Sequence, residues 1–99
     1  MFHSYSGGNN KALTIPSNSK QYDYPQTVVF LYGSYATIGA PFVCTIHARR
    51  NGPNGAWNND VYYQSSSGEP ISVSVDNTAL TITFPYVFAS GAYSVRYTG

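Results

Sequence analysis

The sequence predicts an all-β fold: a single small antiparallel β-sandwich with jelly-roll-like character and about seven strands. Apolar and polar residues alternate with a period of two from residue 12 onward, and no long stretch places apolar side chains at helical spacing. The short apolar runs recur roughly every 8 to 12 residues and are separated by Gly, Pro, Asn and Ser, as in sandwiches and small barrels.

The composition is that of a folded domain with very few charges. Of the 99 residues, 42% are apolar, 16% are aromatic and only 9% are charged, whereas an ordinary soluble domain has roughly 25% charged residues. A disordered chain needs few aromatic residues and a high net charge, so disorder is excluded. Five Lys and Arg against four Asp and Glu leave a net charge of +1, which argues against a nucleic-acid partner.

The amino-terminal part is predicted to hold a lead and two strands. Residues 1–11 are polar and rich in Gly and Asn, so we expect a flexible polar lead before a single sandwich domain at 12–99. Residues 12–15 form a short strand that ends at Pro16. Residues 26–32 are apolar on both parities, which predicts a strand buried on both faces, in mid-sheet under a cover or at a subunit contact.

The middle of the chain is predicted to contain the clearest amphipathic strand and the longest loop. Residues 42–49 alternate strictly, with Cys44 on the apolar face and His47 on the opposite face. The segment 50–60 is polar and rich in Asn and Gly, which predicts a loop before a short strand at 61–64.

The carboxy-terminal third is predicted to be a hairpin followed by a closing strand. Residues 71–75 and 80–84 both alternate, and the Asp-Asn pair at 76–77 suits the turn between them. A second turn at 90–91 leads into the last strand, 93–97, which is expected to direct three side chains inward: Tyr93, Val95 and Tyr97.

The outward faces of the predicted strands are unusual for a monomer. They carry Thr and Ser where an exposed sheet commonly carries Lys and Glu. Because charged side chains are the usual guard against edge-to-edge pairing of sheets, we expect this chain to contact other chains.

Side chains that could support catalysis are few and unsuitably spaced. Cys44 and His47 are three residues apart on one strand, so they point to opposite faces and cannot form a nucleophile and base pair. Cys44 is instead expected to be a small buried hydrophobe. Four carboxylates lie in predicted loops and turns, without the facing pair that a glycosidase needs: Asp23, Asp60, Glu69 and Asp76. No phosphate loop or metal-ligand spacing occurs, so no enzyme activity, cofactor or metal is expected.

The stretch 49–63 holds the strongest candidates for recognition. A sugar ring is bound when an aromatic side chain stacks on its apolar face while Asn, Asp and Arg bond its hydroxyl groups, and this stretch has all of these residue types. The predicted ligand-binding residues are Arg49, Arg50, Asn54, Trp57, Asn58, Asp60, Tyr62 and Tyr63. In the alternative interpretation Trp57 folds back and plugs the end of the sandwich, because a lone Trp in a small domain usually belongs to the core.

Residues 79–99 (ALTITFPYVFASGAYSVRYTG) resemble the carboxy-terminal ends of bacteriophage tail-fibre and receptor-binding proteins. The resemblance lies in a Thr-rich strand that runs into Phe-Pro, then an aromatic link and a closing strand. It covers about a fifth of the chain and rests on composition and rhythm. It implies a β-sandwich head domain, usually homotrimeric, that binds a host surface polysaccharide or an outer-membrane protein. A fibre shaft and a virion-attachment segment are not in the sequence, so an excised tip or a small virion protein is expected.

The leading hypothesis is a non-catalytic adhesion module at the tip of a virion tail fibre. Its expected partners are further copies of itself, a host glycan or outer-membrane protein, and other virion proteins. Two alternatives stay open: a structural virion protein for capsid decoration or tail assembly, and a carbohydrate-binding module of a larger enzyme. No signal peptide or membrane span is expected, because the first eight residues lack an apolar region and no apolar run approaches a membrane-spanning length.

Overall fold

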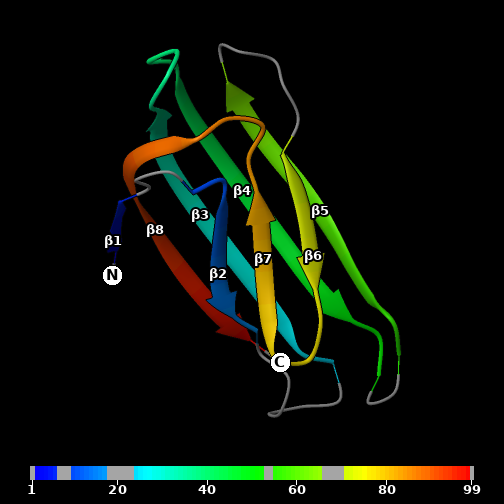
Figure 1. Cartoon of the computed structure of the whole chain (residues 1–99). Coiled ribbons are helices and arrows are strands. Elements are labelled where there is room, and N and C mark those ends of the chain that lie inside the picture. Colours follow the sequence, from blue (N-terminus) through cyan, green and yellow to red (C-terminus); the bar gives the residue numbers. More distant parts are fainter. Residues whose placement is uncertain (1, 7–9, 18–23, 53–54, 66–70, 99) are drawn as a thin grey trace.

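The computed structural model describes residues 2–6, 10–17, 24–52, 55–65 and 71–98. Within these ranges the chain forms eight strands and no helix, which confirms the all-β prediction (Figure 1). The strands are β1 (His3–Ser6), β2 (Ala12–Pro16), β3 (Gln26–Tyr35), β4 (Pro41–Arg50), β5 (Trp57–Ser65), β6 (Ser72–Val75), β7 (Ala79–Thr83) and β8 (Phe88–Thr98). No helix in this part of the chain is long and apolar enough to cross a membrane.

The strands form two antiparallel sheets that pack as a sandwich. The large sheet has the order β1-β8-β3-β4-β5, and the small sheet has the order β2-β7-β6. Figure 1 shows the small sheet lying across one face of the large sheet. The pairing of β1 with β8 and of β2 with β7 is nested, as in a jelly roll, whereas β3, β4 and β5 form a meander within one sheet.

The core lies between the two sheets and follows the predicted alternation. On β4 the even-numbered residues from Phe42 to Ala48 are buried, and the odd-numbered ones are half-buried or exposed. The small sheet contributes buried Ile15, Leu80 and Ile82. A chain of aromatic rings fills one end, with centroids about 5 Å apart at each step from Tyr35 to Phe42, Phe84 and Phe88.

Several elements differ from the predictions in extent. The expected lead contains β1, which pairs with β8 and is therefore part of the sandwich. The expected loop 50–60 is much shorter, because β4 continues to Arg50 and β5 already begins at Trp57. The turn expected at 90–91 is absent, since Gly91 lies within β8 and pairs with Gly33. Pairing with neighbouring strands overrides the weak β-propensity of these Gly- and Asn-containing segments.

The outer face of the large sheet, opposite the small sheet, is not covered by any described element (Figure 1). On β3 the side chains of Val29 and Leu31 are buried, but Phe30 and Tyr32 on the other parity are 41% and 47% exposed. The prediction of a strand buried on both faces was therefore wrong within one chain. The mid-sheet position is confirmed, because β3 is the central strand of the large sheet. No described element covers its outer face, and the subunit contact stays a prediction.

Candidate binding site

The alternation of strand residues divides the predicted binding residues between two faces. β4 and β5 pair so that Arg49 lies opposite Asn58 and Arg50 lies opposite Trp57. Side chains of paired residues point to the same face and successive ones to opposite faces. Four of the predicted residues share the outer face of the large sheet: Arg49, Asn58, Asp60 and Tyr62. Arg50 and Trp57 face the small sheet, while Asn54 and the side chain of Tyr63 lie outside the described residues.

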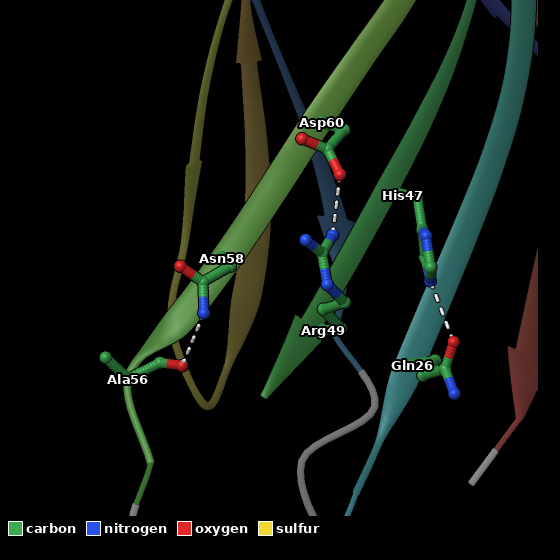
Figure 2. Close-up of polar contacts among 6 residues, drawn as sticks. All are labelled: Gln26, His47, Arg49, Ala56, Asn58 and Asp60. Atoms are coloured by element: carbon green, nitrogen blue, oxygen red, sulfur yellow. Dashed lines mark hydrogen bonds and ion pairs between the residues drawn. The ribbon is translucent and has the colours of Figure 1, made fainter. Parts of the chain in front are cut away.

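The outer group contains an ion pair. Arg49 Nη1 donates to Asp60 Oδ2 at 2.7 Å across the two strands (Figure 2). The two side chains are 36% and 45% exposed, so solvent screens their attraction, and pairs of this kind contribute about 0 to 1 kcal/mol to stability. The ion pair instead fixes the positions of the two side chains on the open face. Both Arg49 and Asp60 keep further hydrogen-bonding groups that face solvent.

Further polar groups surround this ion pair. Next to it, His47 Nε2 lies 2.8 Å from Gln26 Oε1 on β3 (Figure 2). At the start of β5, Asn58 Nδ2 donates to the carbonyl of Ala56 at 3.4 Å. One end of the outer face is thus lined with paired polar side chains.

The rest of the outer face carries large apolar side chains. Its exposed members form the outer patch: Phe2, Phe30, Tyr32, Val43 and Tyr62. The Phe2 ring contacts Phe30 and Tyr32 edge-on, with centroids 6.2 and 5.8 Å away. An aromatic side chain can bury about 150 to 250 Å², so the four aromatic residues at roughly half exposure present about 300 to 500 Å². An apolar patch of this size on a monomer is often functional.

Tyr62 lies where the polar end and the outer patch meet. It stands on β5 opposite Thr45 and is 61% exposed. Asp60 precedes it on the same face by one strand repeat, about 6.8 Å, and Arg49 is bonded to Asp60. An open aromatic ring and three polar side chains therefore share one face of β4 and β5.

The inner group closes the end of the sandwich and forms a second cluster. The Arg50 guanidinium lies 5.6 Å from the centre of the Trp57 ring. Asn77, in the turn between β6 and β7, accepts hydrogen bonds on its Oδ1 from Trp57 Nε1 at 2.8 Å and from Arg50 Nη1 at 3.0 Å. We call these three residues the end cluster. It links the large sheet to the small one.

The end cluster borders a shallow cavity of about 460 Å³. Trp57 is half-buried and packs against the hydrophobic core, so it plugs the end of the sandwich as the alternative interpretation expected. Arg50 stacks on its ring and Asn77 occupies its N–H group. Trp57 consequently offers less aromatic surface to a ligand than Tyr62 does.

Sequence reasoning missed two contributions to these sites. The sequence predicts only a turn at Asn77, because no nearby residue pattern connects Asn77 with Arg50 and Trp57. The apolar part of the outer patch had a signal in the strand with apolar residues on both parities, but the signal did not say which face stays open. Phe2 had none, since it lies in a polar segment.

The buried Cys44 thiol has a perturbed pKa. Burial raises the pKa of the Cys44 thiol to about 12, so the thiolate is scarce at neutral pH. Cys44 lies on the inner face and His47 on the outer face, as predicted. Within the described residues, no three His, Cys, Asp or Glu side chains are grouped so that they could hold a metal ion.

Comparisons with known proteins add no relative. No family model, no curated protein and no solved structure matches this chain.

Proposed function

We propose that this chain is a non-catalytic adhesion module, of the kind found at the tips of bacteriophage tail fibres, and that it binds a cell-surface glycan with the outer face of its large sheet. The observation that carries the proposal is the position of Tyr62. Its ring is open to solvent on an uncovered sheet face, and Arg49, Asn58 and Asp60 lie on that same face.

The chemistry of this arrangement matches a sugar ring. The C–H groups on one side of a pyranose carry partial positive charge and lie favourably against the negative face of an aromatic ring. The hydroxyl groups around the rim need donors and acceptors. Arg49 has five N–H groups of which one bonds Asp60, and the carboxylate accepts on two oxygens.

The charges favour a neutral sugar. Arg49 and Asp60 compensate each other, so the pair presents no net charge to a ligand. An acidic polysaccharide would have to compete with Asp60 for the guanidinium and would meet the carboxylate at close range. Neutral hexoses are therefore the expected ligand class.

The proposal is tested with a glycan array, followed by titration of the strongest neutral ligand. The Tyr62→Ala variant is expected to bind at least tenfold more weakly, because the stacking surface is lost. Ile38→Ala is the matched control: Ile38 is a 50% exposed apolar side chain in the turn between β3 and β4, at the opposite end from Arg49. Equal binding by Tyr62→Ala and the parent, or no ligand on the array, would contradict the proposal.

A second candidate function is a structural virion protein. The specific observation in its favour is the apolar part of the outer patch, where the Phe2 ring contacts both Phe30 and Tyr32 and the three rings suit burial against a protein. A Phe30→Ser/Tyr32→Ser variant would then lose association with virion components, while Tyr62→Ala would have no effect. Light scattering separates the two functions further, since a stable isolated trimer favours the fibre tip and a monomer favours the structural role.

A further inference from the structure

The large sheet contains a slot for a tyrosine between β8 and β3, beside the edge strand β1. Gly33 on β3 and Gly91 on β8 lie directly opposite each other. A Cβ atom added to either glycine would come within 2.7 Å of the Tyr5 hydroxyl oxygen, far closer than side-chain contacts allow. The missing side chains of the two glycines therefore make the room that Tyr5 of β1 occupies.

Tyr5 is bound in this slot by several contacts. Its hydroxyl donates to the Tyr32 carbonyl oxygen at 3.0 Å. Its ring packs edge-on against Phe88, at 5.3 Å, and beside Tyr93, at 6.2 Å. Burial raises the pKa of the phenol well above its ordinary value, which keeps the hydroxyl protonated as a donor. The slot is thus complementary to a strand that carries a tyrosine.

The neighbours of Tyr5 extend the recognition along β1. His3 stacks on Tyr93 with ring centroids 5.3 Å apart, and Phe2 contacts the rings of Phe30 and Tyr32. The strand pairs with β8 through four residues and with no other described strand. The ring and strand contacts of β1 described above are thus made with β8 and β3, and Tyr5 also packs against the core.

The composition of this edge permits exchange. β1 belongs to the large sheet, whereas the next strand along the chain, β2, belongs to the small sheet. Neither His3–Ser6 nor the β8 residues paired with it include Lys, Arg, Asp or Glu. Edge strands that avoid pairing with other chains commonly use such charges, so this edge lacks a guard against a second strand.

We propose that the Gly33–Gly91 slot also accepts β1 of a second copy of this chain, so that copies associate by exchanging this strand. The exchanged strand makes the same four residue pairs and places Tyr5 in the same slot. Because β1 forms between two chains the same pairs that it forms within one, the exchange depends on protein concentration and on the connection between β1 and β2. The occupant is a second copy because the residues that fit the slot are those of β1 itself.

A disulfide trap tests the proposal directly. Ser4 and Ala92 are opposite each other in the β1 and β8 pair, at a separation that a disulfide can span. A Ser4→Cys chain and an Ala92→Cys chain of different mass are unfolded together, refolded at high concentration and oxidised. Cys44 is buried and stays in both chains. A mixed-mass disulfide dimer is expected in large yield, and the Ser4→Cys/Ala92→Cys double variant at low concentration shows closure within one chain.

The control replaces Ser4→Cys by Thr14→Cys, which puts an exposed thiol on β2 of the small sheet. A mixed-mass yield no higher than in this control overturns the proposal, whether the parent is a monomer or associates through another surface. Light scattering gives a second readout that needs no cysteine. The parent mass is expected to fall toward the monomer in Tyr5→Ala and to be unchanged in Tyr24→Ala, which removes an exposed tyrosine outside the slot. A parent that is monomeric at every concentration also overturns the proposal.

Discussion

Asn77 should contribute more to stability than its exposed position suggests. Its Oδ1 is the shared acceptor for Trp57 on β5 and Arg50 on β4, while Asn77 itself belongs to the turn of the small sheet. The substitution Asn77→Ala removes this acceptor and leaves both donors in place. The end of the sandwich then loses a polar link between its two sheets.

The expected loss follows from the burial of the two donors. A hydrogen bond to a charged group contributes about 1.5 to 3 kcal/mol and a neutral one about 0.5 to 1.5 kcal/mol. Arg50 is only 7% exposed, so water replaces its bond poorly, but it also makes a further interaction in the fold and the low end applies. Trp57 is half-buried, and water can take over its bond more readily. The sum is about 2 kcal/mol, or a Tm lower by about 8 to 16 °C for a domain of this size.

Urea and thermal unfolding measure this loss, with the fluorescence of the single Trp as the probe. Asn77→Asp keeps an oxygen acceptor and is expected to lose less than half as much stability as Asn77→Ala. Asn58→Ala is the matched control, because Asn58 is an exposed asparagine with one 3.4 Å bond, and it should stay within about 0.5 kcal/mol of the parent. If Asn77→Ala unfolds with the same midpoint as Asn58→Ala, the end cluster does not join the sheets in the way described.

Two further predictions concern titratable groups. Asp76 Oδ1 accepts hydrogen bonds from the backbone N–H groups of Thr78 and Ala79 and from the Thr78 hydroxyl, which lowers the pKa of the carboxyl. Its stabilising effect is present above the unfolded-state pKa and is lost as pH falls through the folded-state pKa. The urea midpoint of Asp76→Asn should therefore fall less steeply below about pH 4 than that of the parent, and parallel curves would contradict this. Burial raises the pKa of Cys44 to about 12, so iodoacetamide at pH 8 should alkylate the folded protein about a thousandfold more slowly than the urea-unfolded chain; comparable rates would show that the thiol is accessible.

The sandwich was predictable because its core follows from local alternation. The even positions of β4 and β7 are buried, and Val73 and Val75 of β6 pack partly buried against the core. The turn between β6 and β7 uses the expected Asp and Asn. A shift of one residue in either place would expose the whole apolar set, so a period of two determines both face and register.

β1 could not be predicted in this way. Its four residues His-Ser-Tyr-Ser have no apolar alternation, and two glycines follow them. The segment becomes a strand because Gly33 and Gly91, which are far away in the sequence, leave a slot for Tyr5. The local sequence around each of those glycines predicts a turn, and only the pairing of β3 with β8 brings the two glycines together.

The candidate binding residues follow from the residue types in the stretch 49–63. Residue types alone do not say to which face of a sheet each side chain points. With a loop expected at 50–60, the eight candidate residues of the stretch 49–63 could have converged on one ligand. Once the segment is paired as β4 and β5, Arg49 and Arg50 must point to opposite sides of the sheet. The polar character of Asn58, Asn59 and Asp60 predicted a loop, but their pairing with β4 places them in a strand.

The two proposed surfaces lie near opposite edges of the large sheet. β1 and its slot occupy the β8 side, whereas Tyr62 stands on β5 at the far edge of the order β1-β8-β3-β4-β5. Copies joined through β1 would therefore leave each Tyr62 open to a ligand. When binding sites are linked, the first contact raises the effective concentration of the remaining sites at the surface. Weak contacts with single sugars would then combine into strong attachment to a surface that repeats the same glycan. If both proposals hold, an open site with few charges would suffice for adhesion, since the number of copies would supply the affinity that one site lacks.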